Sequence, residues 1–315
     1  MKLVSLPRPV FCTALGLLLA APLGAAPKIG LLLKARTPFW NATERGALAA
    51  AEQLGAEMIV KAPASENDIG IQIQLLHILA EQGVEAVVVA ADSRDALVEP
   101  IAAVAARGIK IVLIDTQLAG EPKYVFVGTD QREAGRAAGA LLAGLIAEGD
   151  PVCFLKHNQT SGATEQRERG AFEKLKELHP GFVARGSIYV GTEKGVETAR
   201  SAQLLDQYPD TKAILASSTA GTMAMVQVLQ EKGRSGAIKF VGFGFNLNSE
   251  VAAAIEAGTL DGWVAQLPAD IGFRGVKAAL GLIKGEAVPA AIATEFLVIT
   301  RRNLHEPKVQ ALMEK

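Results

Sequence analysis

The sequence predicts an α/β protein made of two similar, doubly wound parallel-sheet lobes. Short apolar runs alternate with segments whose apolar residues recur at the helical period. The alternation restarts near residue 129, and the second series matches the first in length and order. Strands that alternate with helices form parallel sheets covered on both faces, so we expect two such sheets.

The first series contains the following candidate elements. Strands are expected at residues 29–33, 57–61, 86–90, 109–114 and 124–127, and helices at 38–54, 68–82 and 94–107. Each helix candidate is followed by a glycine, at Gly55, Gly83 and Gly108, as is typical of helix C-caps.

The second series opens at Thr129-Asp130, which resembles a helix N-cap, and a helix is expected from there to about residue 147. Further strands are expected at residues 152–156, 182–188, 213–216 and 239–242, with helices at 163–178, 194–207, 220–232 and 249–257. No low-complexity linker separates the two series, so the connections between lobes should be tight.

The composition is that of a folded globular protein. The chain has 315 residues, half of them hydrophobic, and a formal net charge of −1. This length allows two domains, and the near-zero charge argues against nucleic acid as a partner.

The N-terminus predicts an exported protein. Lys2 and Arg8 precede an apolar stretch at residues 10–24, followed by small residues, as in a secretory signal peptide. We expect residues 1–25 to be the signal, with cleavage after Ala25. An uncleaved anchor is the alternative, but the apolar stretch is short for a membrane span. Cys153 is then the one remaining cysteine, and it should be a core residue.

No reactive constellation favours an enzyme. The sequence lacks a Gly-x-Ser-x-Gly elbow, a His-Glu-x-x-His motif and a Cys-x-x-Cys motif. Its histidines are His77, His157, His179 and His305, with no metal-ligand spacing. We therefore predict no catalytic residue, no metal and no cofactor.

A series of motifs resembles the periplasmic sugar-binding proteins of ABC importers, the ribose/galactose type within the type I periplasmic binding proteins. The motifs are Pro38-Phe39-Trp40, Glu52-Gln53-Leu54-Gly55, Asp115 at the end of a strand, Val127-Gly128-Thr129-Asp130, the stretch from Thr164 to Phe172, Val241-Gly242-Phe243-Gly244, Ala265-Gln266-Leu267-Pro268 and Gly275-Val276. Their order and spacing across almost the whole mature chain carry the likeness.

The resemblance implies two lobes that close on a ligand by a hinge. It implies an N-terminal lobe of residues 26–129 plus 267–295 and a C-terminal lobe of 130–266 plus 296–315. It further implies a periplasmic monomer that delivers its ligand to an ABC permease in the inner membrane. The alternative is a sensory accessory that presents a ligand, such as a non-sugar or a furanosyl autoinducer, to a membrane histidine kinase or chemoreceptor.

The first-lobe candidates for ligand binding follow two strands. Phe39 and Trp40 could stack on the apolar faces of a sugar ring, or could be core residues at a helix start. Asp115 could accept hydrogen bonds from ligand hydroxyls, or could cap a loop. Lys34 and Arg36 add positive charge to the first loop, unless that loop is simply solvated.

The second-lobe candidates are carried over from the resemblance. They are Glu165, Arg169, Ser218, Asn246 and Gln266. Arg169 matches the ligand arginine of the family, and Arg167 is expected to point inward less; the alternative for Arg169 is an ion pair on the helix surface.

The sequence departs from the ribose pattern at three places. Gly244 replaces a carboxylate, for which Asn246 is the candidate substitute, Thr116 replaces an arginine, and Ser218-Thr219 replace an asparagine and an aspartate. A monosaccharide, a furanose-type sugar or a polyol is therefore the expected ligand, with ribose itself fitting less well.

Overall fold

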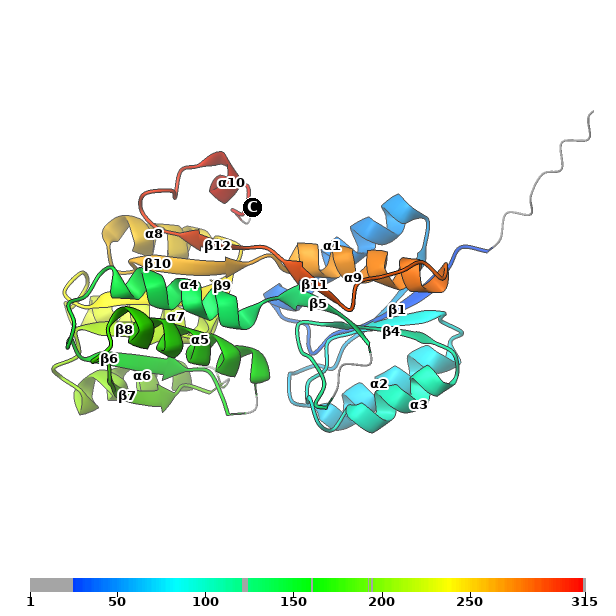
Figure 1. The fold of residues 1–315 in the computed structure, drawn as a ribbon, viewed down its shortest axis with the longest axis horizontal. Coiled ribbons are helices and arrows are strands. Elements are labelled where there is room, and N and C mark those ends of the chain that lie inside the picture. The colour runs from blue at the N-terminus through cyan, green and yellow to red at the C-terminus, as the bar shows by residue number, and fades with distance from the viewer. Residues whose placement is uncertain (1–24, 121–123, 160, 192, 194, 314–315) are drawn as a thin grey trace, which may run out of the picture.

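The computed structural model describes residues 25–120, 124–159, 161–191, 193 and 195–313. It has two lobes side by side, each with one six-stranded sheet between helices (Figure 1). The predicted two-lobe α/β fold is confirmed. The predicted signal peptide lies outside the described residues except for its last position, Ala25. Among the described residues, no helix combines the length and apolarity needed to cross a membrane.

The sheet of the first lobe has the strand order β11-β5-β4-β3-β1-β2, with all neighbours parallel. Its strands are β1 (Lys28–Leu32), β2 (Glu57–Lys61), β3 (Ala86–Val89), β4 (Lys110–Ile114), β5 (Val125–Thr129) and β11 (Ala291–Thr294). Strands β1 and β3 are adjacent although β2 separates them in sequence, so the order in which successive strands are added to the sheet reverses at this pair.

The sheet of the second lobe repeats this order as β12-β10-β9-β8-β6-β7. Its strands are β6 (Val152–Lys156), β7 (Ala184–Tyr189), β8 (Ala213–Ala216), β9 (Lys239–Phe245), β10 (Gly262–Gln266) and β12 (Phe296–Ile299). Only the edge strand β12 is antiparallel to its neighbour.

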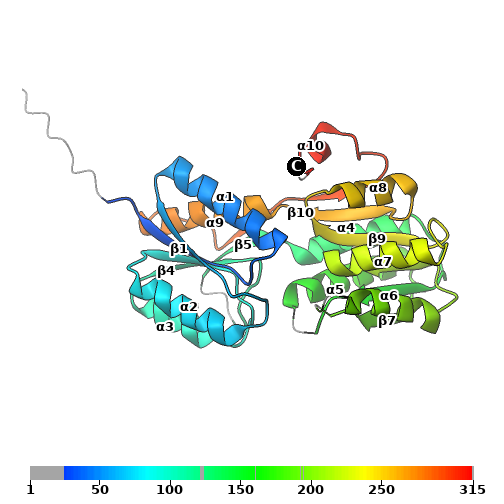
Figure 2. The ribbon, with the colours of Figure 1, turned by 180° about the vertical axis from the view of Figure 1, so that it is seen from behind.

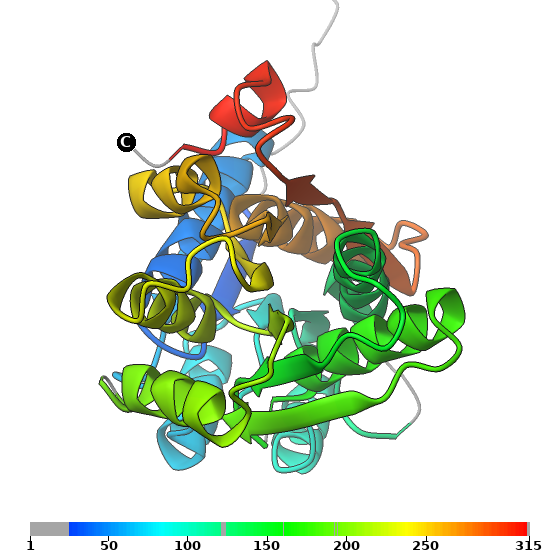
Figure 3. The ribbon, with the colours of Figure 1, turned by 90° about the vertical axis from the view of Figure 1, so that its left-hand side faces the viewer.

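Helices cover both faces of each sheet (Figures 1, 2 and 3). The first lobe has α1 (Pro38–Leu54) and α9 (Pro268–Ile283) over one face, and α2 (Ile69–Glu81) and α3 (Val98–Ala106) over the other. The second lobe has α4 (Gln131–Ala143) and α5 (Gly162–Leu178) over one face, and α6 (Val196–Gln207), α7 (Thr219–Glu231) and α8 (Ser249–Ala257) over the other. The short α10 (Pro307–Gln310) lies beside α8.

The chain passes between the sheets at three places: from β5 to α4, from β10 to α9, and from β11 to β12. Each connection is a single residue, namely Asp130, Leu267 and Glu295. Thr129 and Thr294 lie at two of them, and their hydroxyls are 3.3 Å apart. Short connections that hold two rigid lobes together are suited to a hinge motion.

The largest differences from the predicted helices are at two helix ends. The helix expected from residue 94 begins at Val98, because residues 94–97 form a turn in which the amide of Ala96 donates to the hydroxyl of Ser93. The helix expected to reach residue 147 ends at Ala143. Cys153 is fully buried, as expected.

The helices α1 and α9 approach each other closely through two glycines. A Cβ atom at Gly46 would lie 1.9 Å from the carbonyl oxygen of Ala269, and one at Gly272 would lie 1.9 Å from that of Thr43. Because backbone atoms form both contacts, a methyl group cannot be accommodated by a side-chain rotation. This packing ties α9, which arrives from the second lobe, to the N-terminal helix of the first.

We predict that Gly272→Ala lowers the free energy of unfolding by about 1–3 kcal/mol, as overpacking does. The matched control is Gly70→Ala on α2, where a Cβ would meet nothing within 4 Å. This control should be neutral or stabilising by up to ~1 kcal/mol. Urea unfolding followed by circular dichroism measures both, and equal stabilities for the two variants would contradict the close helix approach.

Candidate functional site

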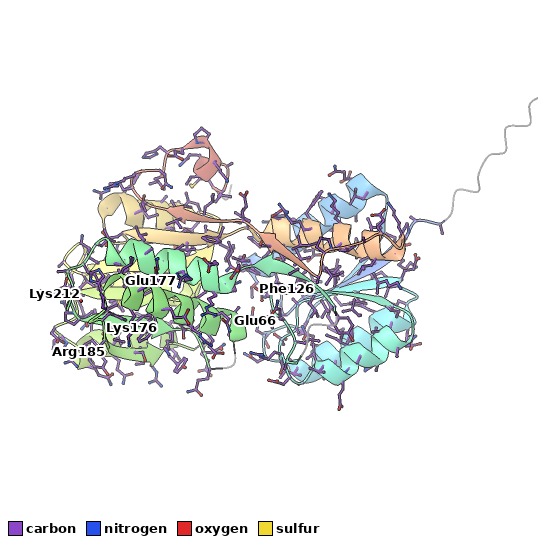
Figure 4. All side chains as sticks on the ribbon, in the orientation of Figure 1. Glu66, Phe126, Lys176, Glu177, Arg185 and Lys212 are labelled. Carbon is purple, nitrogen blue, oxygen red and sulfur yellow. The ribbon has the colours of Figure 1, made fainter. Side chains whose placement is uncertain are left out.

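The candidate site lies where the carboxyl ends of parallel strands from both lobes face each other. Loops after β1, β2, β3 and β4 come from the first lobe, and the loop after β6 comes from the second. Open α/β sheets bind ligands at such ends, next to the point where the strand order switches. Figure 4 shows Glu66 between the lobes, whereas Arg185 and Lys212 lie at the far end of the second lobe.

A buried ion pair forms the wall on the first-lobe side. The ammonium of Lys34 donates to Asp115 Oδ2 at 2.9 Å and to the hydroxyl of Thr116 at 2.7 Å. Burial alone would raise the pKa of Asp115, but the Lys34 charge and hydrogen bonds from Lys34 and Thr116 bring it below its ordinary value. Burial would lower the pKa of Lys34, and the charge of Asp115 raises it instead. Both groups are therefore charged.

A small polar cavity of about 30 Å³ lies next to this pair, between the lobes. Its lining includes Lys34, Glu66, Asn67 and Asp92 from the first lobe and His157, Asn158 and Ser161 from the second. It shares Arg94 and Gly162 with two larger cavities, of about 440 Å³ on the side of Gln131 and about 800 Å³ on the side of Tyr189.

Two buried polar atoms have no protein partner here. They are Asp92 Oδ2 and His157 Nδ1, one from each lobe. Burial raises the pKa of Asp92 to about 7. Burial, with the charges of Arg167 and Lys34, lowers the pKa of His157 to about 4, so this imidazole is neutral at pH 7. Buried polar groups normally have partners, so these atoms indicate a place for a hydrogen-bonding ligand or water.

Arg167 reaches the cleft side of the second lobe. Its Nε donates to Gln131 Oε1 at 2.6 Å, and its Nη1 donates to the carbonyl of Ser217 at 2.9 Å. Its guanidinium carbon lies 5.3 Å from the centre of the Phe243 ring. Burial lowers its pKa to about 10, partly offset by Asp115 and Glu168, so it stays charged.

Gln131 extends this network to the crossovers, because its Nε2 donates to Gln266 Oε1 at 3.0 Å. Gln266 is buried at the end of β10. The crossover residues and the cleft arginine are thus joined by one chain of hydrogen bonds.

An aromatic contact joins the two lobes. The ring of Phe39 on α1 meets that of Phe245 at the end of β9 edge-on, with centres 5.4 Å apart. Phe39 also meets Trp40 at 4.8 Å. Trp40 is 3% exposed, donates from its indole to Glu66, and has the Lys34 ammonium over its ring. In this conformation Trp40 is a core residue supporting the wall, not an open stacking surface.

Backbone strain gathers at the same edge. Among the described residues, the non-glycine residues with positive φ are Asn67, Asp115 and Asn246, at 72°, 62° and 48°. They follow β2, β4 and β9. Such conformations persist only where the surroundings hold them, and they cluster at functional sites.

The structure does not bring all of the candidate residues together. Arg36, in the loop before α1, is exposed and pairs with Glu44 on that helix. Glu165 is exposed and lines only the outer cavity of about 800 Å³. The expected orientations of the two arginines are reversed: Arg169 is 62% exposed and pairs with Glu173 one helical turn away, while Arg167 points inward.

The second-lobe strand ends explain the departures from the ribose pattern. A Cβ at Gly244 would lie 2.0 Å from the Trp263 ring, so the indole occupies the space of a side chain there. Asn246 is held in a left-handed conformation, and its carbonyl accepts from Trp263 Nε1. Ser218 caps α7 by accepting from the amide of Gly221, so its hydroxyl already has a structural role.

Four residues at the cleft are not among the ligand-binding residues predicted from the sequence. They are Asp92, Gln131, His157 and Arg167. Asp92 follows the apolar run of β3 just as Asp115 follows β4, so the rule that selected Asp115 would have selected it too. His157 directly follows β6. Among the described residues, no cluster of three or more His, Cys, Asp or Glu side chains could hold a metal ion.

The chain is similar to a known family of proteins. The family model described as periplasmic binding protein domain matches residues 29–287. A D-allose-binding periplasmic protein of Escherichia coli is 29% identical over 91% of this chain and 94% of that protein. A D-ribose/D-allose-binding protein of Pseudomonas aeruginosa is 27% identical over 82% and 83%.

Solved structures of sugar-binding transport proteins are also similar to this chain. A carbohydrate transporter solute-binding protein of Agrobacterium radiobacter, in complex with D-arabinose, is 25% identical and covers 92% of this chain and 100% of its own, with a TM-score of 0.85. The periplasmic component of a sugar transport system from Hahella chejuensis is 26% identical, with coverages of 87% and 100% and a TM-score of 0.81.

We predict opposite pH effects for Asp92→Asn and His157→Gln. Between pH 3.8 and about 7 the folded state binds more proton at Asp92 than the unfolded state, so this group lowers the free energy of unfolding as pH rises. Between about pH 4 and pH 6.5 the folded state binds less proton at His157 than the unfolded state does. This group therefore raises the free energy of unfolding as pH rises.

Relative to the parent protein, Asp92→Asn should therefore be more stable at about pH 7.5 than at about pH 4.5, and His157→Gln the reverse. Urea unfolding of the ligand-free protein measures this. For each variant, the stability relative to the parent at about pH 4.5 is subtracted from that at about pH 7.5. If this difference has the same sign for both variants, the burial of these two groups is contradicted.

Proposed function

Because the chain belongs to the periplasmic binding protein family, we propose that it captures a monosaccharide between its lobes and delivers it to an ABC import permease. The observation that carries the proposal is the pair of buried, unpartnered atoms, Asp92 Oδ2 and His157 Nδ1, facing the same small cavity from opposite lobes. A ligand that bridges them stabilises the closed arrangement of the lobes.

A polyhydroxylated ligand suits these groups. A hydroxyl can donate to the Asp92 carboxylate or, since the pKa of this group is about 7, accept from its protonated form. It can also accept from, or donate to, the neutral imidazole of His157. The charged Arg167 and Lys34 are held rigidly by Gln131, Ser217 and Asp115, and can donate to further hydroxyls without reorganisation. Relatives named for D-allose and D-ribose, and a similar structure with bound D-arabinose, support a monosaccharide as the ligand class.

The proposal also covers export, location and oligomeric state. The N-terminal segment acts as a signal peptide cut after Ala25, the mature chain works as a monomer in the periplasm, and its role is binding rather than catalysis. The names of its relatives describe binding and transport of sugars, which favours import over the presentation of a ligand to a sensor.

A titration tests the ligand class. We expect the intrinsic fluorescence of the mature protein to change on addition of D-allose, D-ribose or D-arabinose, because Trp40 contacts Phe39 at the lobe interface. Calorimetry gives the affinity. No response to monosaccharides, together with a response to an unrelated solute class, would overturn the proposal.

We predict that Arg167→Lys weakens sugar binding by about tenfold or more, because lysine cannot reproduce the fork of donors held by Gln131 and Ser217. Arg169→Lys, on the same helix but exposed and paired with Glu173, is the matched control and should change the affinity by less than about twofold. Calorimetry measures both, with thermal unfolding as a check of folding. A larger loss for Arg169→Lys would restore the expectation drawn from the motif.

A further inference from the structure

The C-terminal segment, residues 300–313, crosses the second lobe after β12 and packs beside α8 (Figures 1 and 2). Arg301 donates to the carbonyls of Ile255 and Glu256 at the end of α8. Leu304 and Val309 are buried in the same apolar core as α8. The segment is therefore part of the lobe, and its route is fixed by these contacts.

Its last described residues meet the turn between β9 and α8. The amide of Leu247 donates to the carbonyl of Leu312 at 3.1 Å, and Leu247 and Met313 form an isolated parallel bridge. Leu247 is fully buried, while Leu312 and Met313 are partly buried against the core. The end of the chain thus adds a short strand-like contact beside this turn.

The turn has two further anchors. The amide of Asn246 donates to the carbonyl of Gln266 at 3.2 Å, and its carbonyl accepts from Trp263 Nε1 at 2.9 Å. Strand β10 thus holds Asn246, whose φ is 48°, through two hydrogen bonds, and Leu312 holds the next residue, Leu247. A left-handed asparagine costs free energy, so this conformation depends on the contacts around it.

The same turn presents Phe245 to the first lobe. The Phe245 ring meets Phe39 edge-on across the interface, and Phe39 in turn meets Trp40, which underlies Lys34. A displacement of the turn would therefore move the second-lobe partner of the aromatic contact, without touching a group proposed to bind ligand.

We propose that residues 311–313 are a positioning element for ligand capture: they hold the turn at Asn246 and Leu247 so that Phe245 meets Phe39 when the lobes close. This proposal rests on the proposed function. A ligand favours the closed form by its differential affinity, and the aromatic contact between Phe39 and Phe245 stabilises that form with or without ligand. Loss of the positioning element should lower affinity while the second lobe stays folded.

The test compares two shortened chains. A chain ending at Gln310 loses the contacts of Leu312 and Met313 but keeps α10 and the buried Leu304 and Val309. A chain ending at Met313 keeps every contact above and is the matched control. We expect the chain ending at Gln310 to bind D-allose about three- to tenfold more weakly than the control, the range of one aromatic pair. An unchanged affinity would overturn the proposal.

A double-mutant cycle separates positioning from general loosening. With Phe39→Leu in both chains, the difference in affinity should fall below about twofold, because the contact through which the segment acts is already gone. If the two chains that carry Phe39→Leu still differ in affinity as much as the two chains without it, the segment does not act through the aromatic contact, and the proposal is overturned.

Hydrogen exchange gives a reading that needs no ligand. In the chain ending at Gln310, the backbone amides of residues 41–44, in the first hydrogen-bonded turn of α1, should exchange faster than in the control. If the full chain binds no sugar but this change is seen, the proposed function fails and the positioning role stands. Unchanged exchange in the first lobe would overturn the positioning role.

Discussion

The ion pair between Lys34 and Asp115 is the constraint around which the cleft is built. Each charge is removed from most of its water, which costs free energy that the partner must offset. The geometry follows from this need: Asp115 adopts a positive φ to face Lys34, and Thr116 completes the coordination of the ammonium. With Lys34 fixed over Trp40, the first-lobe wall is rigid before any ligand arrives. A preorganised wall loses less entropy on binding than a flexible one.

The second lobe provides the complementary half by a different device. Here the charged group is Arg167, and neutral acceptors hold it: the amide oxygen of Gln131 and the carbonyl of Ser217. Gln131 lies one residue past a crossover and Gln266 lies just before another, so the arginine is tied to the hinge itself. Motion of the lobes about the crossovers and the position of the arginine are therefore coupled through two amide side chains.

The sequence predicted the fold well because periodicity and glycine caps report backbone geometry locally. Helix 38–54 and strands 57–61, 152–156 and 213–216 were predicted to the residue. The site was predicted less completely. Lys34 and Asp115 were predicted just past strand ends, where the structure has them as an ion pair, because an apolar run followed by a polar residue marks the end of a strand. Arg169 was preferred to Arg167 because a motif gives order along the chain but not the rotation of a helix about its axis; two residues along a helix face nearly opposite directions. Nor could any local pattern show that Trp40 would be covered by Lys34, since that contact depends on how the loop folds back.

The contact between Gly244 and Trp263 limits how this protein could change its ligand by small steps. An acidic side chain at position 244 would have to occupy the volume of the indole, with its nearest ring carbon only 2.0 Å from the new Cβ. Removing the indole first would release the carbonyl of Asn246 and leave a void in the core. Either order passes through a damaged intermediate, so the two positions are epistatic. Specificity in this cleft is thus more accessible to change through Asp92 and His157, whose unpartnered atoms no other side chain holds in place.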